Sequence, residues 1–143
     1  QRIDLLSEGK SYSIEDISFE TPVRHVHPVE TYGFVFRTPR HTIAWITDTK
    51  YFDKLVSYYR AELLVINVVM LESRDEVDHL SIPEAKRIIE EARPKAAILT
   101  HFGMSIWRAK PWELAQKLSE DTGVKVISAR DGMRFDLARL EEL

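Results

Sequence analysis

The sequence predicts an α/β protein in which an antiparallel β-meander is followed by alternating helices and strands. Two observations predict this class. Short segments of alternating apolar and polar residues, separated by proline and glycine turns, fill residues 11–46. From residue 49 onward, segments with helical periodicity alternate with almost wholly apolar runs, which are typical of strands buried between layers. Because 44% of the 143 residues are hydrophobic, we expect residues 1–143 to form a single domain with its own core.

The first third of the chain predicts a meander of three or four strands. Residues 11–19 alternate loosely, and because one residue breaks the period of two, we expect one strand with an irregularity there. A second alternating segment covers residues 23–27, and an apolar, aromatic strand covers residues 32–36. A turn then leads into a buried strand over residues 42–46, which ends shortly before Asp48.

The rest of the chain predicts a layer of helices and strands. Ser81 and Glu84 form a capping-box pattern, in which a hydroxyl and a carboxylate satisfy free amide groups at a helix start. Apolar residues at helical spacing predict helices over residues 50–60, 81–93 and 112–122. Apolar runs predict strands over residues 63–71, 96–100, 124–128 and 132–137, followed by a charged tail.

The composition limits the classes of partner and site. The 23 acidic and 20 basic residues give a net charge of −3 without a long basic run, so charge indicates neither a nucleic-acid-binding nor a membrane-binding surface. The chain has no cysteine, which leaves histidine and carboxylate side chains as the ligands for any metal. No apolar run approaches the ~20 residues that cross a bilayer. We therefore expect a soluble, cytoplasmic protein without membrane contact.

Four side chains stand where the predicted elements would bring them to one edge of the sheet. Asp48 and His101 each follow a predicted buried strand. His79 lies in the loop before a predicted helix, and His27 lies where the meander turns at a proline. These groups are expected to share a cleft, and imidazole and carboxylate together suit zinc. Each residue also has a simpler interpretation, the aspartate as a helix N-cap and the histidines as exposed or hydrogen-bonded side chains. The other two histidines receive no role.

Two of these histidines stand in motifs that are more specific than a single residue. The first is Asp78-His79-Leu80-Ser81-x-x-Glu84-Ala85, and the second is Leu99-Thr100-His101-Phe102, and the two histidines are 22 positions apart. With these motifs, residues 23–103 resemble the C-terminal half of the metallo-β-lactamase superfamily. Within it, they resemble the branch that contains ribonuclease Z and the cyclic phosphodiesterases of phosphonate metabolism. The resemblance implies half of an αββα sandwich, with a mixed sheet and flanking helices.

The resemblance implies a metal-binding role for three residues. His27, six residues before a glycine, matches a metal-binding histidine of the superfamily. Asp48 matches the aspartate that bridges two metals, and His101 matches the last metal-binding histidine. His79 matches a histidine that binds no metal and assists proton transfer at the scissile phosphate, so Asp48 and His79 would be the catalytic residues. His25 is a rival for the first histidine, but it lies two residues too far from the glycine.

The resemblance also implies a cofactor of two zinc ions, with manganese or iron as alternatives, that activates a water. The superfamily holds its metals mainly through a His-x-His-x-Asp-His loop, and this sequence contains no such loop. We therefore expect the chain to be the C-terminal half of a hydrolase, to bind at most one metal weakly and to be inactive alone. The missing half is expected from an upstream segment, a second chain or a homodimer partner.

The substrate is the least determined feature. The motif around His79 favours a phosphodiester, in a small molecule or a nucleic acid, and a lactone or thioester is the alternative within the superfamily. A non-catalytic binding or assembly module with the same fold is the alternative from a different class. Phe102, Trp107 and Trp112 follow the last metal-binding histidine. They form either a substrate wall or, in the interpretation that we favour, the packing around a helix start.

Overall fold

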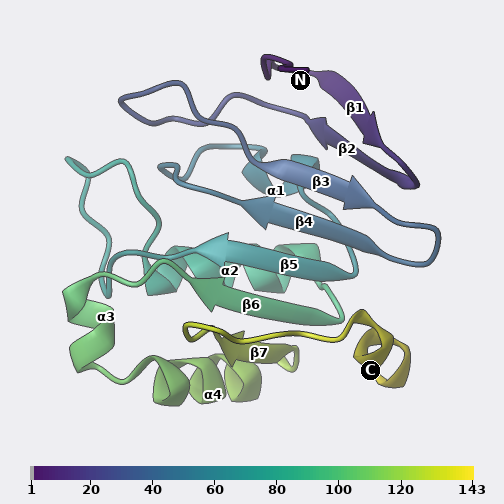
Figure 1. Cartoon of the computed structure of the whole chain (residues 1–143). Coiled ribbons are helices and arrows are strands. Elements are labelled where there is room, and N and C mark those ends of the chain that lie inside the picture. Colours follow the sequence, from purple (N-terminus) through teal and green to yellow (C-terminus); the bar gives the residue numbers. More distant parts are fainter. Residues whose placement is uncertain (1) are drawn as a thin grey trace.

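One seven-stranded mixed sheet forms the centre of the protein, and its strands lie side by side in chain order (Figure 1). A computed structural model describes residues 2–143. The first four strands pair antiparallel, and the strands from β4 to β7 pair parallel. The strands are β1 (Lys10–Ile14), β2 (Ile17–Thr21), β3 (Phe34–Arg37), β4 (Thr42–Ile46), β5 (Leu63–Asn67), β6 (Ala96–Thr100) and β7 (Lys125–Ser128). The predicted α/β class, with a meander before a parallel layer, is confirmed.

Helices cover one face of this sheet, and α1 and α2 lie behind it in Figure 1. The helices are α1 (Leu55–Tyr58), α2 (Ile82–Ala92), α3 (Met104–Arg108) and α4 (Pro111–Thr122), and a 3₁₀ helix, η1 (Leu137–Glu142), ends the chain. None of these helices, in the part of the chain that the structure describes, is long and apolar enough to cross a bilayer.

The alternation of side chains along the strands divides the core in two. Ile46, Leu64 and Leu99 belong to the larger cluster, which lies between the sheet and the helices. On the other face, Leu63 and Ile98 pack in a smaller cluster with the C-terminal segment. This segment is the reason why the central strands are buried on both faces, as their apolar sequences predict.

The N-terminal part of the second face carries a row of aromatic side chains. Phe34 and Phe36 stack with their ring centroids 5.5 Å apart, and Phe19 packs against both. Tyr12 stacks on Phe19 with a centroid distance of 5.0 Å. All four rings are partly exposed, and Trp45 on the neighbouring strand is 39% exposed. This aromatic row therefore keeps apolar surface in contact with water.

The prediction of one irregular strand over residues 11–19 is wrong, because the chain forms a hairpin there. Strands β1 and β2 pair with Ile14 opposite Ile17. The two residues between them make the turn, in which Glu15 has a left-handed φ of 54°. Tight two-residue hairpin turns require such positive φ values. The break in the period of two is therefore a reversal of the chain.

Two further elements of the first half are shorter than predicted. Residues 23–27 form a loop, and its β-pairing is limited to an isolated bridge between Arg24 and Tyr32, outside the strands of the sheet. The helix predicted over residues 50–60 is reduced to the four residues of α1. Its N-cap, Lys54, has a left-handed φ of 69°, so the residues before it cannot continue the helix.

The C-terminal part departs from the prediction at three places. The strand predicted over residues 63–71 ends at Asn67, and α3 was not predicted. Residues 132–137 were predicted as a strand but pair with none of the described strands. The predicted charged tail instead folds into η1, where Leu140 is fully buried. Leu137 packs beside Leu140, so this segment is part of the core.

The start of α2 confirms the predicted capping box. The carboxylate of Glu84 accepts hydrogen bonds from the backbone N–H of Ser81 at 2.7 Å and from its hydroxyl at 3.0 Å. Helix α4 begins at Pro111 and is followed by Gly123 with a φ of 72°, as the helix-terminating preferences of these residues predict. Both helices therefore begin and end close to the predicted positions.

Candidate metal centre

The carboxyl ends of three parallel strands meet at one edge of the sheet. Ile66 of β5 lies opposite Ile46 of β4 and opposite Leu99 of β6. The residues that follow these positions therefore share an edge, which is where ligands bind in sheets of this kind. Asp48 follows β4 and His101 follows β6, as predicted.

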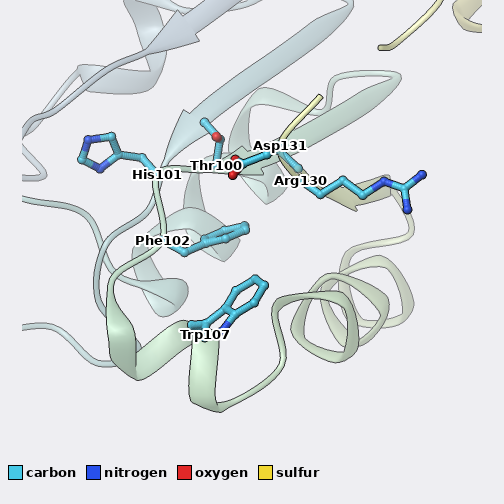
Figure 2. Close-up of a pocket in the computed structure, with 7 residues that line it drawn as sticks. Thr100, His101, Phe102, Trp107, Arg130 and Asp131 are labelled. Atoms are coloured by element: carbon cyan, nitrogen blue, oxygen red, sulfur yellow. The ribbon is translucent and has the colours of Figure 1, made fainter. Parts of the chain in front are cut away.

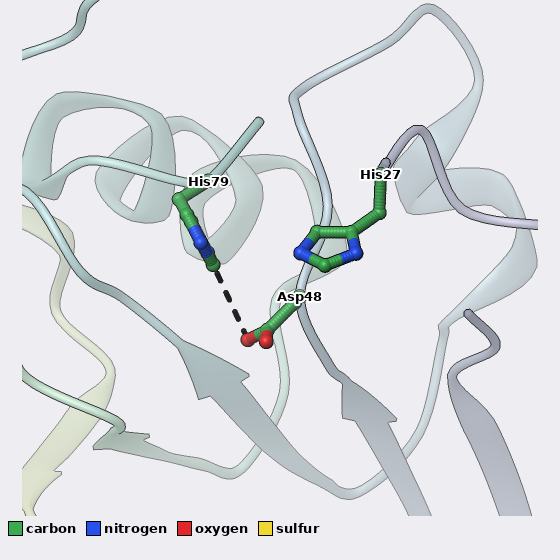
Figure 3. Close-up of side chains that lie close together, drawn as sticks. All are labelled: His27, Asp48 and His79. Atoms are coloured by element: carbon green, nitrogen blue, oxygen red, sulfur yellow. Dashed lines mark ion pairs between the residues drawn. The ribbon is translucent and has the colours of Figure 1, made fainter. Parts of the chain in front are cut away.

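The predicted site residues lie close together at this edge (Figure 3). His27, Asp48 and His79 each offer a ligand atom, and these atoms all lie within 4.8 Å of one another. One oxygen of Asp48, Oδ1, lies 3.8 Å from Nδ1 of His79 and 3.7 Å from Nε2 of His101. Tetrahedral ligands bound to zinc at 2.0–2.2 Å are about 3.4 Å apart. The spacing around Asp48 is thus near that of a metal site.

Backbone hydrogen bonds fix the loop that carries His27. The N–H of Val26 donates to Oγ1 of Thr49 at 3.1 Å, and its carbonyl accepts from the N–H of Lys50 at 2.9 Å. The hydroxyl of Thr31 donates to a backbone carbonyl, so it accepts from Nδ1 of His27, 3.2 Å away. With its hydrogen on Nδ1, His27 has its lone pair on Nε2, the form in which imidazole binds metals.

One nitrogen of His79 is a buried polar atom without a partner in the described part of the chain, beside the carboxylate of Asp48. Its Nδ1 atom is buried and has no hydrogen-bond partner among residues 2–143. A buried polar atom without a partner is costly unless another group satisfies it. The rings of His27 and His79 stand on either side of Asp48, with centroids 5.4 Å apart (Figure 3). Two imidazoles and a carboxylate suit a borderline divalent cation, so the residues present fit a metal.

His101 is arranged differently from the other three residues. Its imidazole is 51% exposed, and it lies outside the group whose ligand atoms are within 4.8 Å. Its φ is +65°, which is uncommon for a residue other than glycine and often marks a functional site. The close group therefore contains His79, predicted as a non-ligand, and not His101, predicted as a ligand. The division of roles between these two histidines stays a prediction.

His25, which received no role from the sequence, holds the backbone of Asp48. Its Nδ1 lies 3.1 Å from the carbonyl oxygen of Asp48, and its Nε2 lies 2.6 Å from the hydroxyl of Tyr59. Because a carbonyl only accepts, Nδ1 carries the hydrogen and Nε2 accepts from Tyr59. Burial lowers the pKa of His25 to about 4, so the ring is neutral near pH 7. No local pattern distinguishes it from an exposed loop histidine.

Gly33 makes room for this contact. A β-carbon at this position would lie 2.5 Å from the hydroxyl oxygen of Tyr59 and 2.6 Å from the carbonyl oxygen of Trp45. Neither group can move freely, because one is buried and the other belongs to strand β4. Any residue larger than glycine would therefore displace Tyr59 and, through it, His25.

A cavity of about 580 Å³ opens beside His101 (Figure 2). The rings of Phe102 and Trp107 form one wall, and Arg130 extends away from them in this view. Trp107 is 57% exposed and Trp112 is 55% exposed. The two rings also pack edge to face at the start of α4, with centroids 6.3 Å apart, as predicted. In addition, Trp107 lines an accessible cavity.

Most of the chain matches one known protein family, because residues 1–102 match the model of a β-lactamase superfamily domain. The chain belongs to the metallo-β-lactamase superfamily. Among curated proteins, it is similar to the uncharacterized protein MJ1374 of Methanocaldococcus jannaschii, with 26% identity over 141 residues. That match covers 96% of this chain and 52% of the other protein. The chain thus spans about half the length of this relative.

Solved structures of the metallo-β-lactamase superfamily share the fold. The metallo-β-lactamase fold protein YhfI of Bacillus subtilis has a TM-score of 0.77 and 21% identity, over 90% of this chain and 53% of that one. The short form of human tRNase Z (ELAC1) has a TM-score of 0.60 and 18% identity, over 88% of this chain and 45% of that one. The resemblance inferred from the two histidine motifs is thereby confirmed, and the chain has the fold of a family of metal-dependent hydrolases.

Proposed function

We propose that this chain is the C-terminal half of a metal-dependent hydrolase that cleaves phosphodiester bonds. The observation that carries the proposal is the convergence of His27, Asp48 and His79, with His101 3.7 Å from the same carboxylate. These residues come from four separate segments of the chain. A scaffold without a site would not need to gather three imidazoles around one aspartate.

In this proposal, His27, Asp48 and His101 hold a divalent cation, which is zinc, manganese or iron. A cation in this position supplies Lewis acidity and makes hydroxide available from water near neutral pH. His27 presents Nε2 as its free nitrogen, and the Asp48 carboxylate contributes negative charge. His79, beside that carboxylate, donates a proton to the departing oxygen. Asp48 and His79 are thus the proposed catalytic pair.

We propose that another segment completes the site. The sequence lacks a His-x-His-x-Asp-His loop, and three ligands do not form a site for two cations. The chain spans about half of its relatives, and the aromatic row offers apolar surface that a second half would cover. An upstream segment, a second chain or a second copy would provide it. Alone, the chain is proposed to bind one cation weakly and to be inactive.

The phosphodiester assignment has two sources of support. The motif around His79 resembles that of ribonuclease Z, and the fold is similar to that of a human tRNase Z. The cavity beside His101, with Trp107 and Phe102 in its wall, would receive the organic group attached to the phosphate. A lactone or thioester is the alternative substrate, and assays of the full-length protein with both substrate classes separate the two.

Zinc titration of this chain by calorimetry tests the site. We expect one zinc per chain, and a loss of binding in His27→Ala and Asp48→Asn. If His79 is the proton donor, His79→Gln keeps the affinity and His101→Gln loses it; the opposite result makes His79 the ligand. His41→Gln is the matched control, because this buried histidine lies near Glu62 instead (3.5 Å).

A complete lack of metal binding would contradict the proposal. If neither this chain nor the full-length protein binds zinc, manganese or iron, the enzymatic interpretation fails. The non-catalytic binding or assembly module would then be the better interpretation. Likewise, phosphodiester cleavage by the pure chain that is lost in Asp48→Asn would contradict the proposed need for a second half.

A further inference from the structure

A buried asparagine contacts the carboxylate at the centre of the site. Asn67, the last residue of β5, is 8% exposed and ends an otherwise apolar strand. Its Nδ2 atom donates a hydrogen bond to Oδ1 of Asp48 at 2.9 Å. Its Oδ1 atom accepts one from Nε1 of Trp45 at 3.0 Å. Both ends of the amide are thus satisfied, as a buried polar group requires.

The two partners impose one orientation on the Asn67 amide. The indole N–H of Trp45 can only donate, so the atom that faces it is the amide oxygen. The carboxylate of Asp48 can only accept when it is ionised, so the atom that faces it is the amide nitrogen. Turning the amide over would place like groups against each other at both ends. Trp45 therefore determines which group Asn67 presents to Asp48.

The strands hold this pair in place. Trp45 lies opposite Val65 in the parallel pairing of β4 with β5, and Asn67 is two residues further along β5. Residues two apart on a strand point to the same face, so all three lie on one face of the sheet. Asp48, by contrast, lies beyond the end of β4. The strand pair thus supports a residue that the sheet itself does not fix.

We propose that Asn67, oriented by Trp45, is a positioning residue that holds Oδ1 of Asp48 toward His79 and His101. The inference rests on the proposed metal site. The oxygen that Asn67 contacts is the one from which the two imidazoles are 3.8 and 3.7 Å away. An amide is suited to this task because it donates a hydrogen bond without charge. A lysine would neutralise the carboxylate, whereas Asn67 leaves its negative charge for a cation.

The hydrogen-bonded chain from Trp45 through Asn67 to Asp48 is called the relay here. It is tested first without metal, by NMR of the indole N–H groups of the three tryptophans. Trp45→Phe assigns the Trp45 resonance. We expect Asp48→Ala to shift this resonance in the chain that contains Asn67 and to leave it unchanged in the Asn67→Leu background. The second background removes the relay and keeps any direct effect of residue 48. An equal shift in both backgrounds, or none in either, would overturn the relay whether or not the chain binds metal.

The positioning role is tested by zinc affinity, measured by calorimetry. Loss of a residue that orients a ligand costs about 10-fold or more in affinity, and we expect this loss in Asn67→Leu. Trp45→Phe should cause a smaller loss, and the double variant should bind no worse than Asn67→Leu alone, because both residues act through one contact. Trp112→Phe, an exposed tryptophan substitution, should leave the affinity unchanged.

Two outcomes separate this inference from the proposed function. Wild-type affinity in a folded Asn67→Leu variant would overturn the positioning role and leave the metal site intact. A purely structural role for Asn67 would lower the free energy of unfolding without this loss of affinity, which urea denaturation of the metal-free chain would show. A wild-type chain that binds no zinc would overturn the proposed function, while the NMR result would still decide whether the relay exists.

Discussion

Asp48 is held by neighbours on two sides. His25 donates to its backbone carbonyl, and Asn67 donates to its carboxylate. The residue before it, Thr47, donates a hydrogen bond from its hydroxyl to the backbone carbonyl of Tyr32 at 2.7 Å. Ligand side chains that are fixed in this way lose little conformational entropy on binding. The fold itself therefore fixes the position of Asp48 in the candidate site.

The buried histidine His25 makes the free energy of unfolding depend on pH. Its pKa is about 4 in the folded chain, against 6.5 for the free side chain, because burial disfavours the charged form. The neutral ring therefore contributes stability that is fully present above pH 6.5 and is lost as the pH falls toward 4. This difference in pKa corresponds to a change in the free energy of unfolding on the order of 3 kcal/mol.

His25→Gln tests this contribution, because glutamine stays neutral at every pH. We expect the wild-type chain to exceed the variant in free energy of unfolding at pH 7. This difference should decrease as the pH is lowered from 6.5 to 4.5. Urea denaturation of the metal-free proteins measures it. A difference that does not vary with pH would show that His25 titrates normally in the folded chain.

The left-handed backbone of His101 predicts a conflict between stability and binding. For residues other than glycine this conformation costs about 1–2 kcal/mol. We expect His101→Gly to raise the free energy of unfolding by up to about 1 kcal/mol and to weaken zinc binding. Lys54→Gly is the matched control, because Lys54 is exposed and has a similar φ of 69°. It should gain stability with unchanged zinc affinity, measured by calorimetry and denaturation.

Sequence reasoning found the residues that carry motifs and missed those that act through burial. His27, Asp48, His79 and His101 stand at recognisable spacings, and the structure places them together. Asn67 was missed because an asparagine at a strand end is usually a solvated residue. Its role depends on the register of neighbouring strands, which no local pattern specifies.

At the scale of elements, predictions succeeded where one physical cause dominated. The apolar runs of β4 and β6 gave the observed bounds, and the capping box gave the start of α2. Predictions failed where single backbone conformations decided the result. Glu15 and Lys54 adopt left-handed φ values that their residue types disfavour, and these turned one predicted strand into two and shortened a helix.

The start of α2 should matter for both folding and binding, because Ser81 is two residues after His79. We expect Glu84→Ala to lower the free energy of unfolding by about 1 kcal/mol and to weaken zinc binding through the loosened loop. Glu84→Gln keeps an acceptor and should behave closer to wild type. Glu90→Ala, on the exposed side of the same helix, is the control and should leave both quantities nearly unchanged. Urea denaturation and calorimetry measure the two effects.

If Glu84→Ala destabilises the chain but leaves its zinc affinity intact, the start of α2 supports the fold alone. The site would then depend on His79 only through its own packing.

At the scale of the whole molecule, the aromatic row predicts association. Apolar surface of this kind is typical of an interface, and we expect the isolated chain to self-associate at high concentration. Phe36→Lys, in the middle of the row, should shift it toward monomer, while Trp112→Lys, outside the row, should not. Sedimentation velocity measures the distribution of species.

A wild-type chain that stays monomeric at every concentration, with no binding of a hydrophobic dye, would show that the aromatic row is not an interface. The proposed second half of the site would then have to contact another surface.

The sequence predicted the layers of the molecule but not how the second face is closed. Met133, Phe135, Leu137 and Leu140 pack on that face at irregular spacings, which fit neither a strand nor an α-helix throughout. Only the neighbouring strands give these side chains a common direction. The C-terminal segment was therefore predicted as a strand followed by a tail, and its packing over the second face of the sheet was not predicted.

The order of the strands has a consequence for synthesis. Within residues 2–143, each strand after β1 pairs with the strand made just before it, so none of these strands has to be inserted between two others. The sheet can therefore grow from one edge as the nascent chain leaves the ribosome. Strand β4, which leads to Asp48, can therefore pair with β3 before His101 has been translated.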